Sequence, residues 1–366
     1  MSDPYSDREQ TRAKHFILGR YLQALAFKVL TFSDVTYVDG FSGPWETKTE
    51  NFSDSSFMIA ISVLQDAQKR ILARMGKRRL VRCFFSENDP TSFAQLEEAV
   101  SIFHKPEEGF EIRTHCGKFE DAVKEIHEFI GPSFPLVFID PTGWTGYPFK
   151  KIKPLFRRQK CEVLINFMYE FVLGGPGWRE RLDPNLPRGL AVEKLFRETL
   201  KSEGNFDFVV STRIDKATAE RPHFFIVYGT KSPDGLKAFR QTEYDALRQH
   251  AKNRASVKER SREERSHTVD LFSSYQAEVQ EATIGQIVDE QKKLASDHLV
   301  KALGVSGPLS FSTVVIALLQ AYMLRETNIR DICVDLAKTS KIENSWGGGK
   351  RKPHDVDIIK LETNAS

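Results

Sequence analysis

The chain has 366 residues, and 53 Lys and Arg against 50 Asp and Glu give it a formal net charge of +3 at pH 7. A composition of 40% hydrophobic and 28% charged residues is ordinary for a soluble globular protein, and so small a net charge identifies no partner. Single hydrophobic cores stop growing at about 250 to 300 residues, so the length predicts a main domain with a smaller companion.

Neither a membrane span nor a secretory leader is predicted. No window approaches 18 uninterrupted apolar residues, and the first ten residues lack the basic-then-apolar layout of a signal peptide. We therefore expect a cytoplasmic protein. The cysteines lie far apart without a Cys-x-x-Cys pair, which predicts no metal site and no disulfide framework. We expect all four to be reduced and buried: Cys83, Cys116, Cys161 and Cys333.

Hydrophobic periodicity predicts alternating helices and strands over the first 230 residues. An amphipathic helix at 14–30 comes first, and nearly continuous apolar strands then alternate with amphipathic helices. This pattern is typical of a parallel sheet covered on both faces. The predicted strands are 35–40, 81–89, 110–117, 135–140 and 161–167, and the predicted helices between them are 55–75, 91–103, 119–130 and a short basic helix after 149.

Two further strands, 206–214 and 223–231, follow a helix near 192–201 and are close enough in sequence to pair antiparallel. Five parallel units followed by a strand and a reversed strand is the order of the class I methyltransferase sheet. The fold class predicted for residues 12–235 is therefore α/β, with a Rossmann-like class I S-adenosylmethionine (SAM) methyltransferase sheet that is parallel except for its antiparallel last strand.

The C-terminal part of the chain has a different character. Residues 236–302 are helical in propensity and highly charged, and seven Lys and Arg face three Glu between Arg248 and Arg265. This segment is either a solvated connecting helix or a helix that faces nucleic acid. Residues 303–364 read as helices followed by a hairpin with a basic glycine-rich tip, which is the outline of a winged-helix-like domain.

Acids and glycines at the ends of the first three predicted strands indicate a ligand crevice. In YVDGFSGP, glycines let the backbone approach a ligand, and an acid after the second strand suits the hydroxyls of a ribose. Phe119, which follows the third strand, is a residue beside which an adenine ring could pack. A tight turn and a helix cap explain the same residues without a ligand. The candidate cofactor-binding residues are Asp39, Gly40, Phe41, Gly43, Glu87, Asn88, Gly117 and Phe119.

Asp140 is the candidate catalytic residue. A carboxylate at the end of a central apolar strand is costly to bury without a partner, and in amine-methylating enzymes an acid or amide there orients the acceptor amine. Trp144 follows as a candidate stacking platform. A polar strand end beside a buried tryptophan is the alternative.

Two basic segments are candidates for contacts with phosphates. One follows Trp144, and the other forms the glycine-rich tip near the C-terminus; a solvated surface is the alternative for the first. The residues concerned are Lys150, Lys151, Lys153, Arg157, Arg158, Lys350, Arg351 and Lys352.

These motifs together resemble the three-Cys-motif partner protein family (TcmP), a bacterial and archaeal group related to class I SAM-dependent methyltransferases. The resemblance spans about residues 12–360. It implies a Rossmann-like methyltransferase fold and a partner protein with a three-cysteine cluster of the radical-SAM type. It rests on Lys14, Leu18 and Tyr21, YVDGFSGP at 37–44, FSEND at 85–89, FIDPTG at 138–143, LINF at 164–167, and Gly235-Leu236-Lys237.

The leading hypothesis is a SAM-dependent methyltransferase that acts on an amine or base of nucleic acid. The alternative is a non-catalytic nucleic-acid-binding partner or scaffold with a degenerate methyltransferase fold. Thr142-Gly143 favours this alternative, because amine methyltransferases have a proline and then an aromatic residue there. An NAD-linked oxidoreductase is disfavoured, since the G-x-G-x-x-G fingerprint is missing.

Overall fold

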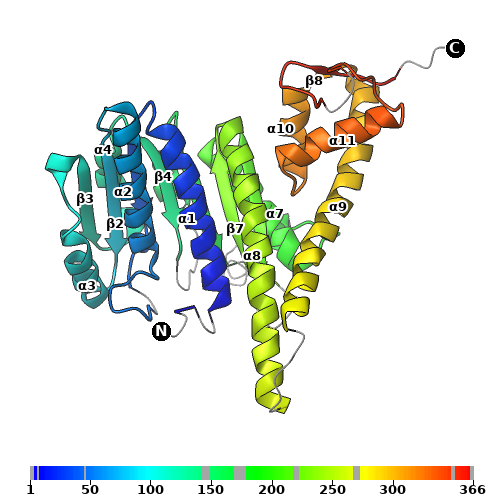
Figure 1. Cartoon of the computed structure of the whole chain (residues 1–366). Coiled ribbons are helices and arrows are strands. Elements are labelled where there is room, and N and C mark those ends of the chain that lie inside the picture. The colour runs from blue at the N-terminus through cyan, green and yellow to red at the C-terminus, as the bar shows by residue number, and fades with distance from the viewer. Residues whose placement is uncertain are drawn as a thin grey trace. The chain divides into compact units, whose positions relative to one another are not determined.

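A computed structural model gives the fold as two compact units, residues Met1–Ser232 and Pro233–Ser366 (Figure 1). Side chains of residues 149, 179 and 255–282 lie outside the description. The structure describes residues 4–5, 8–44, 47–141, 149–168, 179–216, 222–266, 273–347 and 351–362.

The first unit is built on a seven-stranded sheet with the strand order β3-β2-β1-β4-β5-β7-β6. Strands β1 to β5 are parallel, and β7 pairs antiparallel with both β5 and β6. The predicted class I methyltransferase sheet is confirmed by this order. The strands are β1 Val35–Asp39, β2 Val81–Glu87, β3 Phe110–Cys116, β4 Phe134–Ile139, β5 Glu162–Phe167, β6 Phe208–Asp215 and β7 Pro222–Thr230.

Helices cover both faces of this sheet. Helices α1 and α2 lie side by side on one face (Figure 1). Apolar residues of α4, α5 and α7 share a core with every second residue of β5 on the other face. The helices of this unit are α1 Glu9–Val29, α2 Ser56–Met75, α3 Pro90–Ser101, α4 Val123–Ile130, α5 Phe149–Phe156 and α7 Arg188–Gly204.

Two local expectations need correction. The helix predicted at 119–130 is divided into a 3-10 turn, Phe119–Asp121, and α4, because Phe119 turns into the core before the α-helical repeat begins. Cys116 is exposed and not buried, since β3 is an edge strand and this residue is its last. The other three cysteines are buried, as expected, and all four are free thiols. Burial raises the pKa of Cys161 and of Cys333 to about 12.

A buried hydrogen-bonded cluster fastens α1 to the start of β5. Tyr21 Oη donates to Glu162 Oε2 at 2.5 Å and also contacts the hydroxyl of Tyr228. Thr230 Oγ1 donates to Glu162 Oε1 at 2.8 Å. Burial raises the pKa of Glu162 above its ordinary value, although these donors act in the opposite direction. The cluster satisfies a carboxyl group that the apolar interior would otherwise disfavour.

The second unit combines two long helices with a small helical and strand unit. Arg240 of α8 donates to the carbonyl oxygen of Leu319 in α10 at 2.8 Å. Strand β8 pairs antiparallel with β9, and Ile342 forms a bridge with Leu361. The segment predicted as a linker and the segment predicted as winged-helix-like thus belong to one compact unit. Its elements are α8 Pro233–Ser266, α9 Ser273–Ser306, β8 Leu309–Ser310, α10 Phe311–Ala321, α11 Glu326–Lys338 and β9 Ile358–Ile359.

Among the described residues, none of the helices combines the length and the apolar character that a membrane crossing requires.

Replacing Tyr21 by Phe should lower the free energy of unfolding by about 1 to 3 kcal/mol, because Glu162 loses a buried donor. Urea denaturation measures the difference. The matched control is Tyr322→Phe, whose hydroxyl makes exposed hydrogen bonds and should matter by less than about 0.5 kcal/mol. Equal effects of the two substitutions would contradict the structural role of Tyr21.

Candidate functional site

The carboxyl ends of β1, β2 and β4 meet at one edge of the sheet, as the sequence predicted for parallel strands. The turn after β1 lies between its two neighbours. The amide of Gly40 donates to the carbonyl oxygen of Phe138 at 3.1 Å, and the amide of Ser42 donates to that of Ser86 at 2.9 Å. The backbone of this glycine turn therefore crosses the edge from β4 to β2, which is where open α/β sheets bind ligands.

Asp39 holds the glycine turn together from within. Its Oδ1 accepts the amide of Phe41 at 3.1 Å, and its Oδ2 accepts the hydroxyls of Ser56 at 2.8 Å and Tyr37 at 3.2 Å. The side chain is fully buried. Burial raises the pKa of Asp39 to about 6, although the hydrogen bonds from Ser56 and Phe41 act in the opposite direction. Asp39 thus organises the turn instead of presenting its carboxylate to solvent.

Asp140, the predicted catalytic residue, is held between α1 and β5. Lys14 Nζ lies 2.5 Å from its Oδ2, and Asn166 Nδ2 donates to its Oδ1 at 2.7 Å. The Asp140 side chain is 14% exposed. Burial alone would raise the pKa of Asp140, but the charge and hydrogen bond of Lys14 and the Asn166 donor hold it below the ordinary value. The carboxylate is therefore ionised and already paired.

A cavity of about 310 Å³ opens between the start of α1, the glycine turn and Asp140, a size near the lower limit for small-molecule sites. The N-terminus of α2, capped by Ser55, also reaches this cavity and gives it a positive partial charge. The lining residues are Arg8, Thr11, Lys14, His15, Phe41, Gly43, Asp54, Ser55, Ser56 and Asp140.

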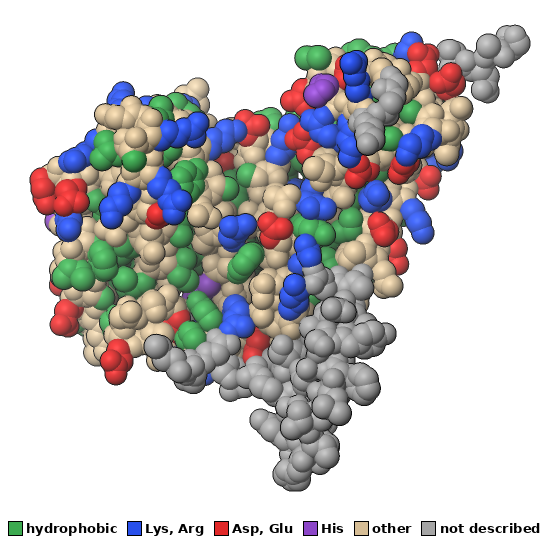
Figure 2. Space-filling view, viewed as in Figure 1, with side chains coloured by type: hydrophobic (Ala, Val, Ile, Leu, Met, Phe, Trp, Pro, Cys, Tyr) green, Lys and Arg blue, Asp and Glu red, His purple; other side chains and the backbone are tan. Residues whose placement is uncertain are grey.

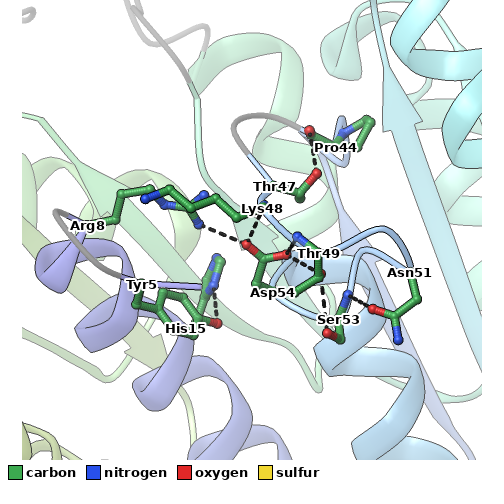
Figure 3. A network of polar contacts seen from close by, with 10 residues as sticks. All are labelled: Tyr5, Arg8, His15, Pro44, Thr47, Lys48, Thr49, Asn51, Ser53 and Asp54. Carbon is green, nitrogen blue, oxygen red and sulfur yellow. Dashed lines mark hydrogen bonds and ion pairs between the residues drawn. The ribbon is translucent and has the colours of Figure 1, made fainter. Parts of the chain in front are cut away.

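Asp54 anchors one wall of the cavity (Figure 3). Its carboxylate accepts the amide of Lys48 at 2.9 Å and the hydroxyl of Thr49 at 2.6 Å. Arg8 Nη2 lies 3.3 Å from Asp54 Oδ2, and Arg8 is only 9% exposed. The remaining guanidinium nitrogens, Nε and Nη1, are buried and have no hydrogen-bond partner among the described residues. Such donors favour an anionic group in the cavity.

His15 completes the wall as a neutral side chain. It lies 3.1 Å from the hydroxyl of Tyr5 (Figure 3). Burial, reinforced by the positive charge of Lys14, lowers the pKa of His15 to about 3. The imidazole is therefore uncharged at neutral pH and is a weak base. Within the described residues, no group of three or more His, Cys, Asp and Glu is arranged to hold a metal ion.

The residues predicted for the nucleoside lie at the same edge but do not line this cavity. Glu87 Oε1 accepts the amide of Asp89 at 2.7 Å, and Asp89 caps α3 through Ser92. Asn88 is exposed. The amide of Gly117 donates to the carbonyl oxygen of Glu87 at 2.9 Å, which brings the ends of β2 and β3 together.

Phe119 is packed onto the glycine turn. It is 4% exposed and belongs to the hydrophobic core, and a Cβ added at Gly40 would lie 2.8 Å from its ring. Glycine is therefore required at position 40 by close packing. The ring of Phe41 lies 6.1 Å from that of Phe119, so the two aromatic residues cover the turn together.

The predicted basic segment after Trp144 is spread along α5 and beyond its end. Lys151 lies 3.4 Å from Asp121 at the carboxyl edge, and Lys153 lies 2.5 Å from Glu203. Arg158 instead contacts the carbonyl oxygen of Gly131, which precedes β4. Lys150 and Arg157 are exposed. Since the segment runs from the carboxyl ends of the strands toward their amino ends, its five cations do not gather beside Asp140. Trp144, Thr142-Gly143 and Lys350 lie outside the described residues.

Sequence reasoning missed several residues of this site: Arg8, His15, Asp54 and Asn166. Asn166 carried a readable signal, because it is a polar residue inside the apolar strand run LINF. Arg8 and His15 carried none, since charged and polar residues on an amphipathic helix are ordinarily solvated. Lys14 entered only through the family resemblance, and the structure pairs it with Asp140.

No family model matches the chain, and no curated protein matches it in sequence. Solved structures with a limited likeness to it include two O-methyltransferases and a methyltransferase subunit of a restriction-modification system. The O-methyltransferase TomG from Streptomyces achromogenes, in complex with SAM, is 17% identical over 58% of this chain and 79% of that one, with a TM-score of 0.33.

An O-methyltransferase from Bacillus cereus, in complex with S-adenosylhomocysteine (SAH), is 16% identical over 58% of this chain and 80% of its own, with a TM-score of 0.32. The methyltransferase subunit of a type I restriction-modification system from Streptococcus thermophilus is 12% identical over 58% of this chain and 43% of its own, with a TM-score of 0.30. Likenesses at this level carry no argument about activity, and the fold class rests on the strand order itself.

The raised pKa of Asp39 predicts a specific dependence of stability on pH. With a folded-state pKa of about 6 against an ordinary 3.8, the folded protein binds the proton more tightly, so the free energy of unfolding falls as pH rises from about 4 to 6. The fall attributable to Asp39 amounts to at most about 3 kcal/mol.

Asp39→Asn should remove this contribution, whereas Asp121→Asn, at an exposed carboxylate, should leave it in place. Denaturation at pH 4.5 and pH 7 gives the difference for each protein. The same pH dependence in Asp39→Asn and in the unsubstituted protein would contradict the assignment.

Proposed function

We propose that the protein is a SAM-dependent methyltransferase. The observation that carries the proposal is the glycine turn after β1 in a sheet of methyltransferase strand order, with a cavity that reaches from this turn to Asp140 at the end of β4. Ligands of open α/β sheets bind at this edge.

The residues around the cavity fit the amino-acid end of SAM. Arg8 has two buried guanidinium nitrogens without a partner among the described residues, and the α2 N-terminus adds positive partial charge. Both suit a carboxylate. Gly40 and Gly43 let the backbone approach the methionyl chain, and Asp39 holds that turn in shape.

Glu87 is proposed to bind the ribose hydroxyls, with Asn88 and Gly117 beside it at the ends of β2 and β3. Phe119 and Phe41 are proposed to contact the adenine. Because the Phe119 ring packs on Gly40, the nucleoside requires this ring to swing outward or has to stack on its outer side.

SAM supplies an activated methyl group, so the contribution of the protein is mostly positioning. Asp140 is proposed to orient the acceptor at the end of β4. Trp144 is proposed to stack on a base. Among the described residues, the neutral His15 and the paired Asp140 are poor bases, which favours an acceptor that is nucleophilic without first losing a proton.

Nucleic acid is the proposed substrate class. The order of elements in the second unit is that of a winged helix. Helix α9 is followed by the short strand β8, helices α10 and α11, the bridge at Ile342, a long turn and strand β9. Arg351 and Lys352 are exposed on the long turn. Lys352 Nζ lies 2.6 Å from Asp331 of α11, and cations and acids are interspersed around α10 and α11 (Figure 2). Phosphate contacts therefore rest on the turn and not on a continuous basic face.

The TcmP resemblance supports a further proposal, that the protein works with a radical-SAM-type partner carrying three cysteines. A second candidate function is a non-catalytic nucleic-acid-binding scaffold. The pairing of Asp140 with Lys14 and Asn166, and the packing of Phe119 on Gly40, favour it, because both contacts have to be rearranged or bypassed by ligands.

Asp140→Asn should leave SAM binding within about threefold and reduce methyl transfer by about 100-fold, because the acceptor loses its orientation. Calorimetry with SAM measures the first, and incorporation of tritiated methyl groups into mixed DNA, tRNA and protein measures the second. Asp121→Asn is the control, since its exposed carboxylate contacts only Lys151 among the partners described.

Unchanged methyl transfer in Asp140→Asn would contradict the role of Asp140. Binding of SAM without incorporation into any substrate by the unsubstituted protein would favour the scaffold. Failure to bind SAM would contradict the proposed function as a whole.

The double substitution Arg351→Ala and Lys352→Ala should weaken binding to duplex DNA and reduce the slope of log K against log salt by about 2, one for each phosphate that is no longer neutralised. Fluorescence anisotropy over a salt series measures both quantities. The control is Lys69→Ala with Arg70→Ala, two exposed cations of α2 in the first unit. An unchanged slope would contradict the proposed role of the turn.

A further inference from the structure

The side-chain oxygen of Asn166, the residue that donates to Asp140, has no role in the proposed function. Asn166 lies in β5 one residue before the strand ends and is 5% exposed. Its neighbours Ile165 and Phe167 belong to the core under α4, α5 and α7. Side chains alternate along a strand, so Asn166 faces the side of the sheet that α1 covers.

The orientation of the Asn166 amide is determined by its partner. An ionised carboxylate accepts hydrogen bonds and cannot donate them, so Nδ2 and not Oδ1 points at Asp140 Oδ1, at 2.7 Å. Oδ1 then faces away from Asp140. This oxygen is buried and has no hydrogen-bond partner among the described residues. A buried carbonyl oxygen without a donor is unfavourable, which favours any ligand that supplies one.

We propose that Asn166 Oδ1 accepts a hydrogen bond from the N–H of the group that is methylated, which makes the acceptor an amino group. This inference rests on the proposed function and narrows its substrate class. Asp140 has one oxygen engaged by Lys14 and the other by Asn166, whereas the Asn166 amide oxygen is a buried side-chain acceptor that has no donor among the described residues.

An amino group suits the surroundings of Asn166 better than a hydroxyl group. Methylation of a hydroxyl group needs a base to take its proton. Among the described residues beside Asp140, His15 has a pKa of about 3 and the pKa of Asp140 itself is lowered, so both are poor bases. Asp39 has a higher pKa, about 6, but its side chain is fully buried and both of its oxygens accept the hydrogen bonds that hold the glycine turn. A neutral amine needs no such base. Its lone pair forms the new N–C bond while the S–C bond breaks and its electron pair stays on sulfur, which becomes a neutral thioether, and the resulting ammonium releases its extra proton to water.

A pair of nucleoside ligands tests the proposal without knowledge of the acceptor. SAH has a plain thioether at the transfer point, whereas sinefungin carries an amino group there. If Asn166 Oδ1 receives an N–H, sinefungin should bind about 10-fold more tightly than SAH, the effect of one hydrogen bond from a charged donor. In Asn166→Leu, an apolar side chain of similar size, the preference should fall below about threefold while SAH affinity is retained. Calorimetry measures all four affinities.

Lys14→Met is the matched comparison. Like the Asn166 substitution, it removes one hydrogen bond from Asp140. Unlike that substitution, it leaves the Asn166 Oδ1 atom in place and frees the Asp140 carboxylate for the sinefungin ammonium. The preference should therefore rise or stay. Asn166→Ala is a second variant in case Leu prevents folding, which thermal unfolding would reveal.

The outcomes separate the two proposals. Loss of the sinefungin preference in the Asn166 variants alone supports the inference. An unchanged preference in those variants, or an equal loss in Lys14→Met, would overturn it, because Asn166 would then have no role or act only through Asp140. Binding of neither ligand to the unsubstituted protein would overturn the proposed function and this inference with it.

Discussion

The first unit depends on two buried carboxylates that fasten α1 to the sheet. Asp140 is paired with Lys14 near the start of the helix, and Glu162 accepts the hydroxyl of Tyr21 two turns later. Seven helical residues span about 10.5 Å. Asn166, which lies beside Asp140, is four positions after Glu162, and this separation spans about 13 Å of strand, so α1 runs antiparallel along β5 with matched spacing. Because Glu162 is buried and the Asp140 side chain is only 14% exposed, neither attachment can be removed without leaving an unpaired polar group largely shielded from water.

This attachment also decides the electrostatics of the cavity. Each charge that lines it has an opposite partner, Arg8 with Asp54 and Lys14 with Asp140, and His15 is neutral. Because the charges of the site are paired with one another, the site binds a ligand mainly through hydrogen-bond donors and acceptors of fixed direction, and less through a net electrostatic field. Specificity then depends on geometry, such as the direction of a guanidinium N–H or an amide oxygen, and weakly on the overall charge of the ligand.

The sheet could be predicted from the sequence because long apolar strands alternate with periodic helices, and parallel strands bring their carboxyl ends to one edge. Asp39, Glu87 and Asp140 were placed correctly for that reason. Their partners could not be predicted, since Lys14 and Asn166 are 152 residues apart and meet only through the packing of α1 on β5. The burial of Phe119 was equally hidden, because an aromatic residue after a strand fits a ligand surface and a core position alike.

The contact between Phe119 and Gly40 has a kinetic consequence. The ring packs on the turn and shares a core with Ile126 and Phe129, so moving it means breaking well-packed apolar contacts. If a nucleoside binds only when the ring is displaced, its observed affinity is the intrinsic affinity multiplied by the fraction of molecules in that conformation. Its association rate would then level off with concentration at the rate of ring opening.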